Sequence, residues 1–228
     1  GWIASFLENH DQPRAIDKFI LDKKEHNYYS QTMLAGMFFN LRGTPFIYQG
    51  EEIGMENFER KDISEFDDIG SHGQYQRALE EGFTKEEAMH FLNLRSRDNT
   101  RTPMQWDSSE YAGFSNHEPW LKMTGSQDKI NVESQFNDPN SIYSFYKKMI
   151  SIRKQEDTLV YGDFAEVNTV DDVIGYKRTY QGQEIICLCN FTNTEQSIPD
   201  IQGNILLDNY NNYNPTTLKP YQFIMIKK

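Results

Sequence analysis

The first fifty residues alternate short apolar runs with polar turns. Residues 2–7 are mostly apolar and a polar turn at residues 9–13 follows them, whereas residues 33–41 repeat apolar side chains at the spacing of one helical face. Residues 46–48 form a further apolar run. These patterns predict a strand, a helix that ends near Gly43, and a second strand. This succession indicates a βαβ unit whose two strands pair in parallel.

The middle of the chain, residues 51 to about 140, shows little periodicity and is rich in Asp, Glu, Asn and Gly. One helix is predicted near residues 75–92. The remainder has the pattern of irregular chain, which at this length is usually functional or disordered, and its aromatic side chains argue against disorder. Asp138-Pro139-Asn140-Ser141 is a helix-start signal, after which an apolar stripe predicts a helix from Ile142 to Lys154.

The last part of the chain consists of short β-type runs separated by Gly, Asn, Asp and Pro. Residues 173–176 and 184–191 flank Tyr180-Gln181-Gly182-Gln183, which is a hairpin signal. Residues 221–226 predict a last strand. We therefore expect residues 158–228 to form a small all-β domain.

Composition restricts the class of protein. The 228 residues carry 23 Lys and Arg against 34 Asp and Glu, a formal charge of −11, and 14 % of them are aromatic. So many large apolar rings exclude disorder as the main description. The acidic balance argues against nucleic acid and anionic membranes as partners, because both require Lys and Arg. No apolar stretch is long enough for a membrane span, and the abrupt apolar start at Gly1 suggests a piece of a longer protein.

The two cysteines, Cys187 and Cys189, fall on one face of a predicted strand. A disulfide between them would be strained, so buried free thiols in a reducing compartment are the favoured interpretation over a bridge or a metal pair. The sequence contains no Cys/His ligand cluster and no Ca²⁺-loop pattern. We therefore predict no metal site in this chain.

Two segments could carry chemistry on their own. Asn9-His10-Asp11 directly follows a predicted strand, where parallel-sheet proteins place their sites, but the same residues could form an Asx-type turn. Residues 95–106 contain three arginines among hydrogen-bonding side chains and end in Trp106. Such a loop could bind a carboxylate or sugar hydroxyls, and a structural network of ion pairs is equally compatible with it. The acids Glu51 and Glu52 favour a solvated turn.

Several segments, in their order along the chain, resemble the α-glucosidase branch of the α-amylase family, glycoside hydrolase family 13. The resemblance is to oligo-1,6-glucosidases, dextran glucosidases, trehalose-6-phosphate hydrolases and sucrose isomerases. It rests on residues 6–14, 43–55, 96–107, 118–121, 130–132 and 138–148.

This resemblance implies a fold and a set of site residues. Residues 1–157 would be the C-terminal part of a catalytic (β/α)₈ TIM barrel, its last two βα units with a long insertion after the eighth strand. Residues 158–228 would be a C-terminal antiparallel β-sandwich domain. Asp11 matches the invariant carboxylate that binds the sugar 2-OH and 3-OH and stabilises the transition state. His10 matches a histidine that contacts the same sugar, and Arg97 an arginine that closes the pocket around it.

Other motif positions carry expectations of a different kind. Arg14, Arg101 and Trp106 match positions to which we assign a structural role. Glu51 and Glu52 match a structural stretch and cannot replace a catalytic pair. In the resembling enzymes the dipeptide Asp-Ile after the eighth strand is followed by Glu, whereas here Gly70 follows it. The preference for the sugar beyond the cleaved bond is therefore left open.

The resemblance implies that the chain is the C-terminal fragment of a cytoplasmic, cofactor-free, retaining exo-acting α-glucosidase for short α-glucosides. The nucleophilic Asp and the acid/base Glu belong to earlier strands, so we expect the isolated chain to be inactive. The alternatives are a non-catalytic structural or sugar-binding module, including a relative of amino-acid transporter heavy subunits, and a parent that is a sucrose isomerase or trehalose-6-phosphate hydrolase. The expected partner is a small oligosaccharide or disaccharide, and apolar strand edges predict that the fragment self-associates.

Overall fold

A computed structural model describes residues 2–228, which form two compact units. Unit 1 comprises the residues up to Leu7, Asp22–Phe46 and Pro139–Lys228. Unit 2 comprises Glu8–Leu21 and Ile47–Asp138. Both units are assembled from segments that are distant in the sequence, and the domain boundary expected at residues 157 and 158 stays a prediction. Within the described residues no helix has the length and apolar character needed to cross a membrane.

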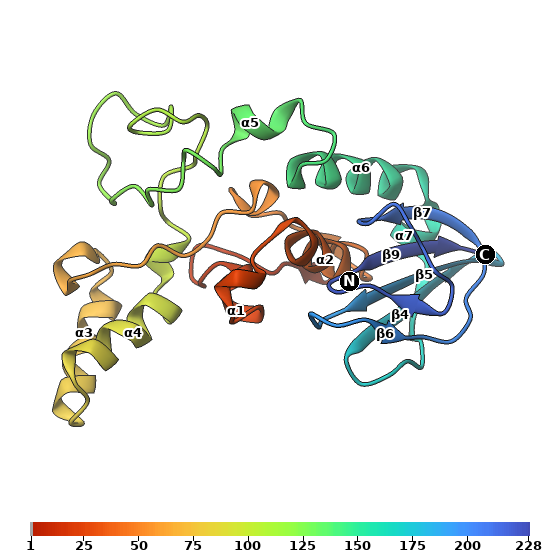
Figure 1. The fold of residues 1–228 in the computed structure, drawn as a ribbon, viewed down its shortest axis with the longest axis horizontal. Coiled ribbons are helices and arrows are strands. Elements are labelled where there is room, and N and C mark those ends of the chain that lie inside the picture. Colours follow the sequence, from red (N-terminus) through yellow and green to blue (C-terminus); the bar gives the residue numbers. More distant parts are fainter. Residues whose placement is uncertain (1) are drawn as a thin grey trace. The chain divides into compact units, whose positions relative to one another are not determined.

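A five-stranded antiparallel sheet forms the centre of unit 1 (Figure 1). Its strands, in spatial order, are β3 (Asp163–Glu166), β4 (Val173–Tyr180), β5 (Gln183–Asn190), β9 (Phe223–Lys227) and β7 (Asn204–Asp208). A separate two-stranded ribbon pairs β6 (Gln196–Ser197) with β8 (Thr217–Leu218). The expected antiparallel β region at the end of the chain is thus confirmed.

The predicted hairpin is also confirmed, because β4 and β5 pair along their whole length up to Tyr180 opposite Gln183. The two turn residues, Gln181 and Gly182, both have positive φ, 49° and 81°. Such turns match the right-handed twist of the strands that they connect. Cys187 and Cys189 are both free and buried in β5, as predicted, and burial raises the pKa of Cys187 to about 12.

The core of unit 1 is apolar and follows the strand pattern. One cluster fills the space between the sheet and the ribbon, and its members are Val173, Ile186, Leu188, Ile198, Ile201, Leu218, Ile224 and Ile226. Three helices contact the sheet strands, namely α2 (Tyr28–Phe39), α6 (Ile142–Gln155) and α7 (Asp157–Tyr161) (Figure 1). Gly36 of α2 lies against the Phe223 ring so closely that a Cβ there would clash.

A buried cation connects α2 and α7 to the sheet. Arg178 of β4 donates to the carbonyls of Leu159 and Gly162 at 2.7 Å and of Asn40 at 2.9 Å. These carbonyls lie near the C-terminal ends of α7 and α2, where the helix dipole favours a positive charge. Burial lowers the pKa of Arg178 to about 10.

The predicted parallel pair at the start of the chain is confirmed in part. β1 (Ala4–Ser5) pairs in parallel with β2 (Thr44–Pro45). The second strand therefore ends just before the apolar run at residues 46–48 that predicted it. α2 begins at Tyr28 because Asn27 and Ser30 form a capping box, and it ends at Phe39 rather than near Gly43. α6 begins after Ser141, which caps it as the sequence predicts.

Unit 2 holds short helices joined by long irregular loops. Its α-helices are α1 (Ala15–Phe19), α3 (Ile69–Glu80), α4 (Lys85–Arg95) and α5 (Val132–Phe136). Its 3₁₀ helices are Glu51–Ile53, Ile63–Glu65 and Arg97–Asn99, and unit 1 has a further one at Lys23–Glu25.

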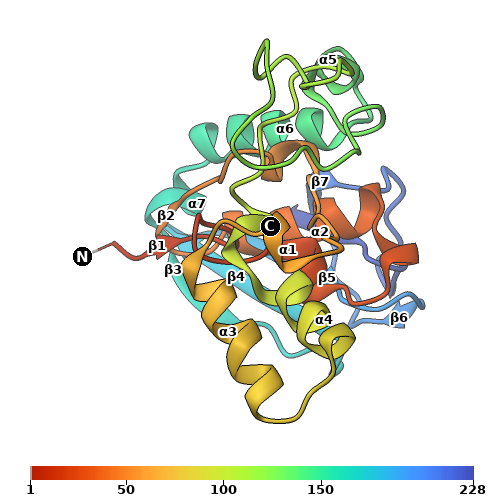
Figure 2. The same ribbon diagram turned by 90° about the vertical axis from the view of Figure 1, so that its left-hand side faces the viewer.

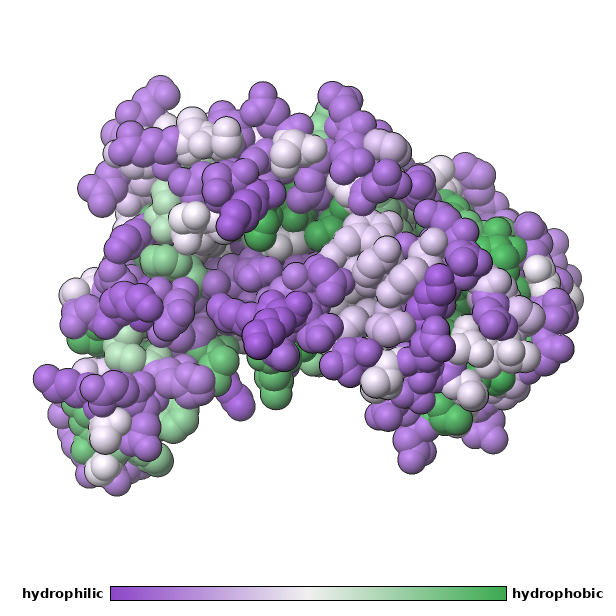
Figure 3. All heavy atoms as spheres, viewed as in Figure 1, coloured by the Kyte–Doolittle hydropathy of each residue, from purple (hydrophilic) through white to green (hydrophobic). Residues whose placement is uncertain are grey.

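The single helix expected near residues 75–92 is wrong, because the structure divides this region into α3 and α4. Gly82 has a φ of 93°, and Thr84 begins α4 with a capping box to Glu87. The two helices run side by side (Figure 2). Apolar residues interrupt the hydrophilic surface of this pair (Figure 3). Phe83 and Phe91 are exposed, and their rings contact each other edge to face.

Candidate functional site

The turn that carries His10 and Asp11 is held in place by a buried ion pair. Arg14 Nη1 donates to Glu8 Oε2 at 2.8 Å and to the Gln49 carbonyl at 2.8 Å. Glu8 Oε1 accepts the backbone N–H of Ala15 at 2.8 Å. Burial raises the pKa of Glu8, and the Arg14 charge opposes that rise. Arg14 therefore has the structural surroundings that the sequence predicts.

The turn itself is an Asx turn, but Asn9 makes it. Asn9 Oδ1 accepts the backbone N–H of Asp11 at 2.8 Å, and the Asn9 carbonyl accepts the N–H of Gln12 at 3.3 Å. The side chains of His10 and Asp11 are not used in these two bonds. Asn9 thus makes the Asx turn that one interpretation expected, and the side chains of His10 and Asp11 are left for the functional interpretation.

Asp11 is the centre of a charged network on the surface of unit 2. Its Oδ1 accepts from Arg97 Nη1 at 3.2 Å and from Arg101 Nη2 at 3.0 Å, and its Oδ2 lies 3.2 Å from His10 Nε2. The side chain of Asp11 is half exposed. The hydrogen bond from Arg97 holds the pKa of Asp11 below its usual value, assisted by the charges of His10, Arg97 and Arg101.

Arg97 connects Asp11 to a second carboxylate. Its Nε and Nη2 donate to Asp68 Oδ1 at 2.8 Å and 2.5 Å. Burial acts to raise the pKa of Asp68, but the hydrogen bond and charge of Arg97, with bonds from Gly70 and Ser71, outweigh it and the net pKa is lowered. The pKa of Arg97 is raised, first by Asp68 and then by Asp11.

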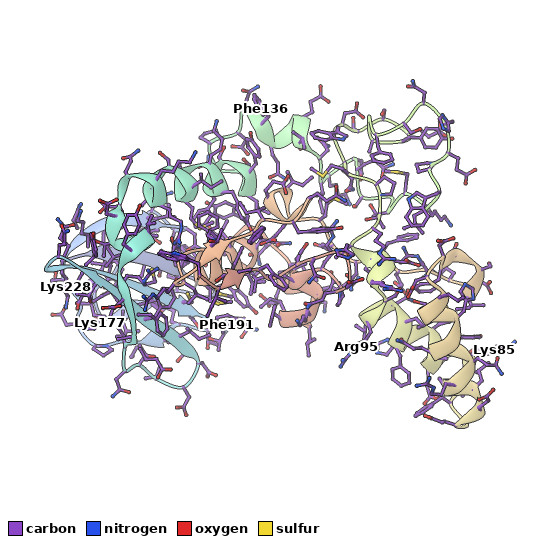
Figure 4. All side chains as sticks on the ribbon, turned by 180° about the vertical axis from the view of Figure 1, so that it is seen from behind. Lys85, Arg95, Phe136, Lys177, Phe191 and Lys228 are labelled. Carbon is purple, nitrogen blue, oxygen red and sulfur yellow. The ribbon has the colours of Figure 1, made fainter. Side chains whose placement is uncertain are left out.

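A buried carboxylate fixes the segment that carries Asp68. Asp98 is fully buried, and its Oδ2 accepts the backbone N–H groups of Asp67 at 2.9 Å and Asp68 at 3.0 Å. Arg60 donates to the Asp98 carbonyl at 3.1 Å. The Arg97 segment, which directly follows the labelled Arg95 end of α4 (Figure 4), is thereby tied to the start of α3.

The Arg97 segment is also bonded to the turn that carries Asp11. Thr100 Oγ1 donates to the Gln12 carbonyl at 2.8 Å, and Arg101 Nε donates to the His10 carbonyl at 2.9 Å. The same Arg101 side chain bonds the Asp11 carboxylate. Arg101 therefore positions both the backbone of the turn and the Asp11 carboxylate.

The structure brings the three predicted site residues, His10, Asp11 and Arg97, into one network. Sequence reasoning missed Asp68 as a member, although an acid directly before a helix start is a recognisable cap. It also assigned Arg101 a structural role, whereas this arginine contacts Asp11 directly.

Glu51, Glu52 and Trp106 make none of the hydrogen bonds described above for the Asp11 network. Glu51 accepts the N–H of Tyr48 at 3.2 Å and Glu52 that of Gly50 at 2.8 Å, so both serve a local turn. The expected solvated face is wrong for Glu51, whose residue is only 5 % exposed. Trp106 is about half exposed, at 51 %.

The site offers chemistry suited to a polyhydroxyl ligand. Within the described residues, 2–228, no group of three or more His, Cys, Asp and Glu side chains is arranged to hold a metal ion. An exposed, ionised carboxylate accepts hydrogen bonds from hydroxyl groups, and the adjoining guanidinium and imidazole groups donate them. Alternating acceptors and donors of this kind match the hydroxyl groups of a sugar.

Known proteins match this chain along its whole length. The Alpha-amylase family, described as the alpha amylase catalytic domain, matches residues 1–162. The oligo-1,6-glucosidase of Halalkalibacterium halodurans is 37 % identical over 97 % of the chain and 42 % of its own length. The trehalose-6-phosphate hydrolase of Bacillus subtilis is 35 % identical over 100 % of the chain and 42 % of its own length.

Solved structures agree with these matches. The trehalulose synthase MutB from Pseudomonas mesoacidophila superposes with a TM-score of 0.93 at 37 % identity, over 100 % of this chain and 43 % of that one. The chain therefore spans less than half the length of the relatives that it matches. These findings confirm the resemblance derived from the sequence motifs, and the chain belongs to the alpha-amylase family.

Proposed function

We propose that this chain is the C-terminal part of a retaining, exo-acting α-glucosidase that hydrolyses short α-glucosides, such as isomalto-oligosaccharides or related disaccharides. Relatives named oligo-1,6-glucosidase, glucan 1,6-alpha-glucosidase and alpha-glucosidase support this substrate class. The observation that carries the proposal is the network in which Arg97 and Arg101 hold the exposed Asp11 carboxylate ionised.

The chemistry of this network fits the transition state of a retaining glycosidase. The sugar ring acquires positive charge at that point, and hydrogen bonds to its 2-OH strengthen. An ionised carboxylate placed in advance accepts such a bond with little reorganisation. Asp11 therefore has the role of transition-state stabiliser, His10 contacts the same sugar, and Arg97 closes the pocket around it.

The proposal includes a place for the chain in the whole enzyme. β1 and β2 are the last two strands of a (β/α)₈ barrel, and the sheet of β3, β4, β5, β9 and β7 belongs to a C-terminal β-sandwich domain that begins near residue 158. The nucleophilic Asp and the acid/base Glu come from earlier strands. The isolated chain consequently has no hydrolytic activity.

A second candidate acts on a different disaccharide. The solved MutB structures include a complex with the substrate sucrose, and relatives include trehalose-6-phosphate hydrolases. A sucrose isomerase or a phosphodisaccharide hydrolase would use the same Asp11 network. Comparison of isomaltose, sucrose and trehalose 6-phosphate as substrates distinguishes these activities.

Two further expectations belong to the proposal. We place the enzyme in the cytoplasm, without a cofactor. We expect the isolated chain to self-associate, because Trp2, Ile3 and Phe46 are exposed by 55, 73 and 55 % next to the short β1–β2 pair. Size-exclusion chromatography tests this expectation, and a clean monomer would contradict it.

The test of the function compares Asp11→Asn with the unchanged enzyme on p-nitrophenyl α-D-glucopyranoside. Asparagine keeps the shape of the side chain but removes its charge, so kcat should fall by about 10²- to 10³-fold or more. Asp67→Asn is the matched control, since Asp67 is exposed and should be replaceable without loss. Near-normal turnover of Asp11→Asn would refute the role of Asp11. Absence of α-glucoside hydrolysis by the unchanged enzyme would refute the proposed activity.

A further inference from the structure

We propose that Asp68 is a positioning residue of this site, which fixes Arg97 so that the arginine stabilises Asp11 without occupying it. The inference rests on the proposed function, because it concerns how the sugar-binding carboxylate is kept available. It adds a residue to the site that neither the motifs nor the comparisons assign.

The guanidinium of Arg97 is shared between two carboxylates. Arg97 directs two of its nitrogens, Nε and Nη2, at Asp68 Oδ1 and only Nη1 at Asp11 Oδ1. The bonds to Asp68, 2.8 and 2.5 Å, are shorter than the 3.2 Å bond to Asp11. Because a guanidinium is planar and rigid, two bonds on one edge determine where the third nitrogen points.

Asp68 is itself immobilised. Its side chain is only 8 % exposed, against 38 % for Arg97 and 50 % for Asp11. Oδ2 of Asp68 caps α3 by accepting the N–H of Ser71 at 3.1 Å, which leaves Oδ1 for Arg97. Its backbone N–H is bound by the buried Asp98. Asp68 is therefore a fixed point, whereas Arg97 is a long side chain with several rotamers.

Asp68 also determines which arrangement Arg97 adopts at Asp11. An arginine beside a carboxylate favours a bidentate arrangement with two parallel hydrogen bonds. At Asp11 such an arrangement would engage both oxygens, including Oδ2, to which neither arginine donates in the structure. Asp68 prevents it by holding Nε and Nη2. Asp11 thus stays ionised, and its Oδ2, which lies 3.2 Å from His10 Nε2, stays clear of both arginines and can accept a sugar hydroxyl.

The test uses Asp68→Asn in the active enzyme, since asparagine is also a good helix cap and preserves the start of α3. Displacement of a catalytic contact by about 1 Å costs on the order of 10²-fold in rate. We expect kcat/KM on p-nitrophenyl α-D-glucopyranoside to fall by about that factor, with kcat reduced as well as KM raised, while Asp67→Asn leaves both unchanged.

Two readouts separate positioning from a structural effect. In an Asp11→Asn background, Asp68→Asn should cost little further, because the residue that it serves is already lost. Equal losses in both backgrounds would overturn the proposal. A crystal structure of Asp68→Asn should show Arg97 bidentate on Asp11, and an unmoved Arg97 would likewise overturn it. The crystal structure decides about Asp68 even if the enzyme proves inactive on α-glucosides, a result that contradicts the proposed function alone.

Discussion

The interiors of the two units differ in their share of apolar side chains, although each unit buries side chains of both kinds. The sheet of unit 1 encloses an apolar cluster in which side chains such as Leu188 and Ile224 are fully buried. Unit 2 buries charged and polar side chains between its loops, among them Arg14, Arg60 and Asp98. Irregular loops lack a regular backbone ladder, so buried side chains must satisfy their N–H and C=O groups. The unit that presents the site is thus the one in which buried polar side chains make up the larger share of the interior.

The largest expected effect of a substitution in unit 2 comes from Arg14→Met. Removal of the guanidinium leaves the Glu8 carboxylate buried without its counter-charge. We expect a loss of about 3 to 5 kcal/mol in the free energy of unfolding. Hydrogen exchange measured by mass spectrometry should show the loss of protection in peptides of unit 2.

The double variant Glu8→Gln with Arg14→Met provides the control for that prediction. It removes both charges, so it should recover a large part of the stability lost by Arg14→Met alone. A cost below about 1 kcal/mol for Arg14→Met would show that the polar interior is dispensable.

A slightly smaller effect is expected from Leu188→Ala in unit 1. Leu188 is fully buried and belongs to the apolar cluster, so its truncation leaves a cavity. The expected cost is about 2 to 5 kcal/mol, seen as lost protection in the strands of the sheet. Ile174→Ala is the matched control, because Ile174 lies in the same sheet but is 45 % exposed. Equal costs for the two variants would contradict an apolar interior as the source of stability.

The pH dependence of the Asp68–Arg97 pair sharpens the comparison further. The pKa of Asp68 is lowered in the folded chain, whereas an unfolded aspartate titrates near about 3.9. Its contribution to stability is therefore complete above about pH 4 and is lost as the pH falls through the folded pKa. The difference in free energy of unfolding between the unchanged chain and Asp68→Asn should shrink on acidification. Urea unfolding at neutral pH and near pH 3 tests this, and an unchanged difference would contradict the ion pair.

The smallest effect expected is a gain from Gly73→Ala in α3 of unit 2. A Cβ at Gly73 would meet nothing within 4 Å, so alanine should stabilise the helix by about 0.5 to 1 kcal/mol. The same change at Gly36 in α2 of unit 1 should destabilise, because its Cβ would clash with the Phe223 ring. Thermal unfolding of both variants checks the opposite signs, and a gain at Gly36 would contradict the close packing described there.

The regular parts of the chain were the most predictable from sequence. The hairpin of β4 and β5 has a Gln-Gly turn between β-type runs, and α6 has both a cap and an apolar stripe, so local patterns alone identify them. The single helix expected near residues 75–92 overlooks two local signals of the break between α3 and α4, namely Gly82 with its positive φ and the capping box from Thr84 to Glu87. Sequence patterns thus predicted an element correctly where a single helix or strand periodicity extends along the whole segment.

The site was predictable only in part. His10, Asp11 and Arg97 belong to recognisable motifs, and the structure brings them together. Asp68 lies 29 residues before Arg97, with α3 and α4 between them. Its role depends on the hydrogen bonds by which Asp98 holds the Asp68 backbone and Arg60 holds the Asp98 carbonyl. No periodicity encodes such contacts between distant loops. The assignment of Asp11 as a transition-state stabiliser stays a prediction.

The most direct test of the account asks whether Asp11 bonds the sugar 2-OH in the transition state. The measurement is kcat/KM of the unchanged enzyme and of Asp11→Asn on p-nitrophenyl α-D-glucopyranoside and on its 2-deoxy analogue. Bonds to the 2-OH supply several kcal/mol, so its removal should cost the unchanged enzyme about 10²-fold. We predict that Asp11→Asn largely loses this sensitivity to the 2-OH. An equal penalty in both enzymes would contradict the account, because the 2-OH would then be bound by another group.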